Sequence, residues 1–256
     1  MDQNRDETDT PAGTTRRTLL TSHAKAMVGI AAGVVAASLA RVTSAHAVVR
    51  PPCYLKGTRI RTVDGDRAIE ELSVGDLLPT ALAGVQPIEW IGSWRHSKSA
   101  GRSWPDSARP VRIAKSALGP NVPSADLYVT QGHALYIDGV LVTAGSLING
   151  TSIVLDAGEH FAELEYYHIK LPGHAVVFAE GAACETLRQL PAPASGYDTN
   201  ARSGAAPRQD ETCAPVLYSG TSGEIRARLR SMLSPMLGPQ KLDLIRARLA
   251  EAAVAL

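Results

Sequence analysis

Three side chains in this sequence are of the types that break a peptide bond by nucleophilic attack: Cys53, Thr130 and His133. Cys53 follows Pro52 and precedes a predicted strand, so its thiol stands beside the peptide bond that joins the two residues. A thiolate there could attack the preceding carbonyl and convert the amide to a thioester. An unperturbed thiol has a pKa of roughly 8.5, so the attack needs help from neighbouring groups.

The stretch YVTQGHALYIDG (128–139) contains two suitable helpers. Thr130 and His133 are three residues apart, where a predicted strand ends and the chain turns. A hydroxyl can hydrogen-bond the scissile amide, and an imidazole can give a proton to the departing α-amine. The alternative for His133 is an ordinary histidine of a turn or of the core.

The elements that must position these residues are short strands. Between residues 48 and about 185, apolar runs alternate with turn residues, without the βαβ alternation that a parallel sheet requires. Asp138-Gly139 predicts a two-residue hairpin turn. The sequence therefore predicts an all-β fold of antiparallel strands over 58–63, 67–72, 86–92, 110–115, 125–130, 134–137, 140–144, 151–155, 162–171 and 175–180.

Taken together, these features resemble the Hedgehog/intein (Hint) superfamily, and bacterial Hint-domain proteins most closely. The resemblance covers about residues 53–185. It is carried by C-x-x-x-G-T-x-I-x-T-x-D-G from Cys53, by I-E-E-L-x-V-G-D from Ile69, by T-x-x-H from Thr130, and by EYYHIKLPGHAVVFAEG (165–181).

The resemblance implies a Hint fold with Cys53 as the nucleophile and with Thr130 and His133 as the pair that activates the scissile amide. It also implies that His168 assists later proton transfers, a role for which His174 competes. A plain sheet histidine is the alternative for His168. Hedgehog-type domains use an acidic residue as well, and the sequence offers Asp76, Glu89 and Asp126 without choosing among them.

Splicing is not expected, because splicing inteins end in His-Asn before a Cys, Ser or Thr. Asn121, Asn149 and Asn200 all lie in other contexts. Cleavage before Cys53 remains, with the chain's own N-terminal segment as substrate and water, an amine or an alcohol as the second nucleophile. This would be autocatalytic self-processing rather than turnover of an external substrate. Pro52 as the acyl donor constrains the backbone at the reacting carbonyl and predicts a slow reaction.

Residues 1–47 have the pattern of a twin-arginine-type signal peptide. Arg16 and Arg17 precede an apolar run over 26–40, and Ala45 and Ala47 form a small-x-small cleavage pattern. The run is shorter than the roughly 20 residues that span a bilayer, so no stable membrane span is expected after the signal is removed. We expect export to the periplasm or beyond the cell, with a basic amphipathic tail or an uncleaved anchor as the alternative.

After the predicted Hint domain (48–189), a segment rich in Pro, Ala, Gly and Ser (190–221) predicts a linker or surface loop. The remaining chain (222–256) predicts two short helices, over 222–233 and 239–256, that pack on the strands. Cys184 and Cys213 either form a disulfide after export or remain free thiols.

Composition excludes several classes. Lys and Arg number 26 against 25 Asp and Glu, so the formal net charge of +1 does not favour a nucleic-acid partner. Three cysteines without C-x-x-C spacing argue against a disulfide scaffold and a structural zinc site, and we expect no metal or organic cofactor. Besides self-processing, two functions stay open: an exported Hint fold kept as a binding or structural module, and a hydrolase that uses Cys53 and His133 on other molecules.

Overall fold

The structure is a computed structural model that describes residues 52–98, 101–189, 198–199, 211–217 and 238–254. The predicted signal peptide (1–47) and the first predicted C-terminal helix (222–233) lie outside the described residues. Within the described part of the chain, no helix is both long and apolar enough to cross a membrane.

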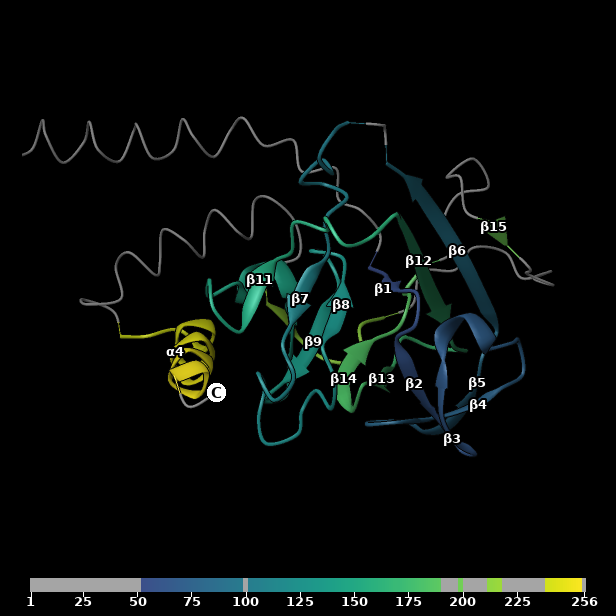
Figure 1. The fold of residues 1–256 in the computed structure, drawn as a ribbon. Helices are drawn as coiled ribbons and strands as arrows, with labels where there is room; N and C mark the ends of the chain where they lie inside the picture. Colours follow the sequence, from purple (N-terminus) through teal and green to yellow (C-terminus); the bar gives the residue numbers. More distant parts are fainter. Residues whose placement is uncertain (1–51, 99–100, 190–197, 200–210, 218–237, 255–256) are drawn as a thin grey trace, which may run out of the picture. The chain divides into compact units, whose positions relative to one another are not determined.

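Strands dominate the described residues, and they form two seven-stranded sheets and one two-stranded sheet (Figure 1). Every pairing is antiparallel except the parallel pair of β10 with β16. The predicted all-β fold is therefore confirmed.

The first sheet, in spatial order, contains β11 (Ile153–Leu155), β7 (Val111–Ile113), β8 (Leu127–Val129), β1 (Tyr54–Leu55), β12 (Glu163–Lys170), β6 (Trp90–Ser97) and β15 (Asp198–Thr199). The second contains β16 (Val216–Leu217), β10 (Val140–Thr143), β9 (Ala134–Ile137), β14 (Ala182–Glu185), β13 (Val176–Ala179), β2 (Arg59–Thr62) and β3 (Gly65–Ala68). The small sheet pairs β4 (Leu77–Thr80) with β5 (Gly84–Pro87). Two of these strands, β15 and β16, lie within the segment predicted as a linker.

Two tight turns connect strands of the second sheet. Asp138 and Gly139 join β9 to β10 with φ values of 51° and 81°, so the hairpin predicted from this pair is present. Glu180 and Gly181 join β13 to β14 in the same way, with φ values of 48° and 78°. Positive φ at both central residues matches the twist of antiparallel strands, and glycine adopts it without steric cost.

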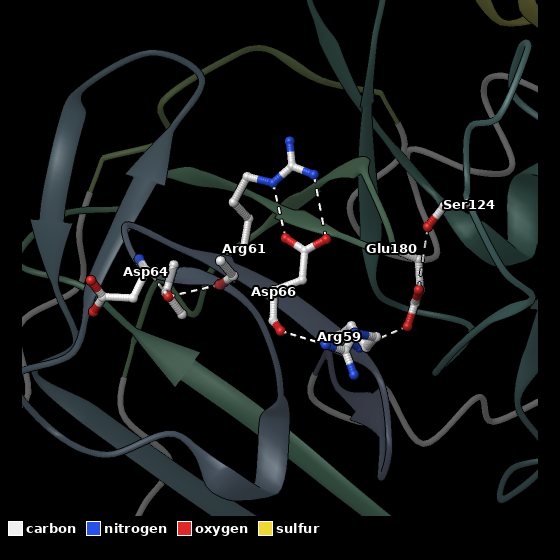
Figure 2. Close-up of polar contacts among 8 residues, drawn as sticks. Arg59, Arg61, Asp64, Asp66, Ser124 and Glu180 are labelled. Carbon is white, nitrogen blue, oxygen red and sulfur yellow. Dashed lines mark hydrogen bonds and ion pairs between the residues drawn. The ribbon is translucent and has the colours of Figure 1, made fainter.

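Polar contacts fix the β2–β3 hairpin and the turn at Glu180 (Figure 2). Arg61 binds both carboxylate oxygens of Asp66 across the hairpin. The Glu180 carboxylate accepts the Arg59 N–H at 2.7 Å, and the Glu180 N–H donates to the Arg59 carbonyl at 2.8 Å. Strand β2, which begins inside the motif C-x-x-x-G-T-x-I, is thereby tied to the β13–β14 turn, 121 residues later in the chain.

Some predicted boundaries were wrong. The strand expected over 67–72 ends at Ala68, and Ile69–Glu71 form the 3₁₀ turn η1. The Ile69 N–H donates to the Thr58 carbonyl, and the Ile69 side chain is fully buried in the main core together with that of Leu72. The strand expected over 86–92 is divided, because β5 ends at Pro87 and β6 begins at Trp90.

The main core lies among both large sheets and includes Ile60, Val129, Leu135 and Ile169. The second predicted C-terminal helix is present as α4 (Lys241–Val254). Its Leu242, Ile245 and Leu249 recur at helical spacing and are buried in the same core. Arg246 Nε donates to the Ser146 carbonyl at 2.7 Å, and Arg248 pairs with Asp138 in the β9–β10 turn. Helix α4 thus packs on the β9–β10 hairpin and the segment that follows it, close to His133 in the chain.

Candidate active site

The pairing of β1 with β8 brings Cys53 and Thr130 together, because Tyr54 and Val129 are register partners. The Cys53 N–H donates to Thr130 Oγ1 at 2.9 Å, and the Thr130 N–H donates to the Cys53 carbonyl at 2.9 Å. The first of these bonds is made by the amide of the Pro52–Cys53 peptide, which is the bond that the sequence analysis expects to break. Cys53 is buried, with 1% of its surface exposed.

His133 is held by a turn and by a second loop packed behind it. Its N–H donates to the Thr130 carbonyl at 3.0 Å, which closes the turn that carries both side chains. The turn η2 (Ala144–Leu147) contributes the Ala144 N–H to the His133 carbonyl at 2.8 Å and the Gly145 N–H to the Gln131 carbonyl at 2.9 Å. A Cβ at Gly145 would lie 3.1 Å from that carbonyl oxygen, so only glycine allows this approach without movement.

Two buried imidazoles lie beside the Tyr54 ring. The ring centroid of Tyr54 is 4.2 Å from that of His133 and 6.2 Å from that of His168, and the two imidazoles are 5.6 Å apart. Both histidines have 0% of their surface exposed. Within the described part of the chain, no ring nitrogen of either histidine makes a hydrogen bond of good geometry, although the Cys53 backbone lies close enough to His133 to influence its pKa. Buried polar groups are nearly always paired, so two buried imidazoles without such hydrogen bonds are candidates for a functional role.

Burial keeps both imidazoles neutral. It lowers the pKa of His133 to about 4, although the Glu185 charge and the Cys53 backbone partly oppose this shift. Burial also lowers the pKa of His168 well below its usual value, and positive charge on His133 or His174 would lower it further. A neutral imidazole has a free nitrogen lone pair, so at neutral pH these groups are able to accept a proton.

His174 occupies a different environment from His168. Its Nδ1 accepts the Cys213 N–H at 3.2 Å, and its Nε2 lies 3.3 Å from Glu185 Oε2. Burial opposes charge on this ring, but Cys213 and Glu185 favour it and raise its pKa to about 9. Of the two, His168 is the one in ring contact with His133 and Tyr54.

The three acidic candidates make other contacts. Asp76 binds Arg67 and the Ser73 N–H, and Asp126 binds Arg112 and the Lys115 N–H. For Glu89 the described bond is made by its backbone, whose N–H donates to the Lys170 carbonyl. These contacts stabilise turns and strand ends.

Sequence reasoning missed the acidic residue that does lie near the histidines. Glu185, at the end of β14, is 7% exposed, and its carboxylate accepts the Ala134 N–H at 2.8 Å. Tyr54 was missed as well, although it directly follows Cys53 and its hydroxyl donates to the Glu185 carbonyl at 3.1 Å. Nothing in the local pattern around Glu185 signals this position, because it depends on the pairing of β14 with β9.

The three cysteines all lie in the described residues, and none of them forms a disulfide. Cys184 is fully buried in the main core, whereas Cys213 is partly exposed beside a smaller cluster that contains Ala134 and Val176. Of the two alternatives for Cys184 and Cys213, the structure therefore has the unpaired one. Among the described residues, no group of three or more His, Cys, Asp or Glu side chains is placed to hold a metal ion.

The family comparison agrees with this geometry. The model of the family described as Hint domain matches residues 52–191, which is more than half of the chain. The chain belongs to the Hint domain family. Its match begins one residue before Cys53 and spans β1 to β14, so it includes Thr130, His133, His168 and Glu185. No curated protein matches the chain.

Proposed function

We propose that this Hint domain cleaves its own chain before Cys53 through an N-to-S acyl shift. The observation that carries the proposal is the 2.9 Å hydrogen bond from the Cys53 amide to Thr130 Oγ1, next to the unpaired imidazole of His133. The amide that would break is held by a hydroxyl, and a neutral base lies in the same turn. This is the arrangement that the reaction requires.

The chemistry proceeds in two stages. In the first, His133 takes the proton from the Cys53 thiol, and the sulfur attacks the Pro52 carbonyl carbon. The C–N bond then breaks, and His133 returns the proton to the departing amine of Cys53, which leaves Pro52 bound to sulfur as a thioester. In the second stage, water, an amine or an alcohol attacks the thioester carbonyl, and the Cys53 thiol leaves.

Each residue has a separate task in this scheme. Thr130 fixes the scissile amide by accepting the Cys53 N–H on its hydroxyl. His133 is neutral at neutral pH, so it can accept the thiol proton before it donates one. His168 lies 5.6 Å from His133, centroid to centroid, and serves the later proton transfers of the thioester. Proline at the acyl position and the burial of Cys53 make the first stage slow.

The test is a fusion of a carrier protein upstream of residues 48–256, followed by intact mass spectrometry. Incubation with hydroxylamine or dithiothreitol should release the carrier with residues up to Pro52, because both reagents attack a thioester. Cys53→Ala should release nothing. Cys213→Ser is the matched control, since it removes a thiol elsewhere and should leave release unchanged. Equal release from Cys53→Ala would contradict the proposal, and absence of release from the wild type would favour an idle Hint fold used as a binding or structural module.

We further propose that the protein is exported by its twin-arginine-type signal. Twin-arginine passengers fold before export, so a fast reaction at Cys53 would remove the signal too early. A slow first stage is consistent with both proposals. Cell fractionation followed by mass measurement tests export: the exported fraction should hold a chain that begins at Val48, or at Cys53 if cleavage has also occurred. A full-length chain found only in the cytoplasm would contradict it.

A further inference from the structure

Glu185 is a buried carboxylate that contacts both segments of the candidate site. One oxygen accepts the Ala134 N–H at 2.8 Å, and the other lies 3.3 Å from His174 Nε2. The backbone carbonyl of Glu185 accepts the Tyr54 hydroxyl at 3.1 Å. These contacts join the end of β14 to three other segments of the chain.

The positions of these partners matter more than their number. Tyr54 directly follows Cys53, and Ala134 directly follows His133. Residue 185 therefore holds the neighbour of the nucleophile through its carbonyl and the neighbour of the base through its side chain. A shift of β14 would move Cys53 and His133 relative to each other, and displacements of about 1 Å are enough to slow such reactions.

The Glu185 charge acts on the same step. In the proposed reaction His133 must hold a proton between the thiol and the amine, and it must do so in a fully buried place. The titratable groups that face or influence it are Tyr54 on β1, His168 on β12 and Glu185 on β14. Of these, Glu185 is the one whose negative charge favours a charged imidazole at His133.

We propose that Glu185 is a positioning residue for the self-cleavage reaction, fixing β1 against β9 and stabilising the imidazolium of His133 while it carries the proton. This inference rests on the proposed function, which supplies the reaction that Glu185 would assist. His174 lies beside the second carboxylate oxygen, with its Nε2 at 3.3 Å, and the Cys213 N–H donates to His174 Nδ1.

The test compares Glu185→Gln with Glu180→Gln in the carrier fusion. Glutamine at 185 keeps an oxygen for the Ala134 N–H but removes the charge. Glu180 is the matched control, because it is also 7% exposed and also accepts a backbone N–H, but it lies at the β13–β14 turn beside Arg59 and Ser124 (Figure 2). We expect release about tenfold slower for Glu185→Gln, corresponding to about one pKa unit at His133, and unchanged release for Glu180→Gln.

The pH profile separates positioning from a general loss of structure. Removal of the charge should move the acid limb of the rate profile to lower pH, because His133 then becomes harder to protonate. NMR titration of the His133 imidazole gives the same comparison without cleavage and should show a lower pKa in Glu185→Gln. An unchanged His133 pKa overturns the inference, whether or not the chain cleaves. A wild type that does not release its carrier overturns the proposed function instead, so the two failures are distinct.

Discussion

Two of the buried polar residues on strand β12, Glu165 and His168, have opposite hydrogen-bonding environments. Glu165 is almost completely bonded: its carboxylate pairs with Lys56 at 2.8 Å and with Arg95 at 2.9 Å and accepts the Tyr167 hydroxyl. His168, three residues later on the same strand, has no hydrogen-bond partner on its ring within the described residues. The Glu165 carboxylate thus has hydrogen-bond partners for its charge, whereas the His168 ring has none among the described residues.

The pKa shifts reflect the same difference. Burial opposes the charge of Glu165, but the bonds from Lys56, Arg95 and Tyr167 overcome it and lower the pKa to about 2. At His168 no neighbour offsets the effect of burial. Burial lowers its pKa, and positive charge on His133 or His174 would lower it further. A buried charge with hydrogen-bonded partners is tolerated by the fold, whereas a buried imidazole without them costs stability, which makes His168 a candidate for a functional role.

The largest expected effect is on the rate at which the fusion releases its carrier. His133→Gln should slow release of the carrier by about a hundredfold or more, which is the usual contribution of a general acid–base residue. The measurement is release against time by intact mass, with circular dichroism to show that the variant is folded. A folded His133→Gln chain that releases at the wild-type rate would place His133 among ordinary core histidines.

The second effect is a pH dependence of stability. The pKa of His133 is about 4 in the folded chain and roughly 6.5 when unfolded, so the unfolded chain binds more protons between these values. The free energy of unfolding should therefore fall as pH drops from 6.5 towards 4, by about 1 to 2 kcal/mol per pH unit for each buried histidine. Urea unfolding across this range measures the slope.

The same titration in His133→Gln and His168→Gln supplies the control. Each variant removes one group that resists protonation, so each should show a shallower slope than the wild type. Slopes that match the wild type in both variants would show that the acid sensitivity arises elsewhere.

A smaller effect concerns the strand that backs His168. Gly92 on β6 is the register partner of His168, and a Cβ there would lie 2.4 Å from the Trp90 ring. Gly92→Ala should lower the free energy of unfolding by about 1 to 3 kcal/mol, because a buried indole has to move. Gly173→Ala is the control, since a Cβ at that position meets nothing within 4 Å. Equal stability of the two variants would contradict this packing.

The smallest effect on carrier release is expected at Glu165, whose carboxylate is fully hydrogen-bonded. Glu165→Gln should cost stability on the order of 1 kcal/mol, since both cationic partners are largely exposed and screened by solvent. Release of the carrier should stay within about twofold of the wild type, because hydrogen bonds through Glu165 do not reach Cys53 or His133. A rate loss as large as that of His133→Gln would erase the distinction between the two groups.

The sequence allowed the fold and part of the site to be predicted because both depend on local patterns. Alternating apolar residues gave most strands, Asp138-Gly139 gave a hairpin, and the T-x-x-H spacing placed Thr130 and His133 in one turn. Glu185 could not be found in this way, because its bond to Ala134 spans 51 residues and exists only through the pairing of β14 with β9. The 3₁₀ turn at Ile69 was predicted as a strand, because a buried isoleucine in so short a segment fits a strand and a turn equally well.

The mass of a carrier fusion to residues 48–256 after incubation with hydroxylamine tests the central claim most directly. The account predicts a fragment that ends at Pro52 and a partner that begins at Cys53, both absent from Cys53→Ala and both present in Cys213→Ser. An intact fusion in the wild type, or the same two fragments from Cys53→Ala, would contradict self-cleavage at this bond.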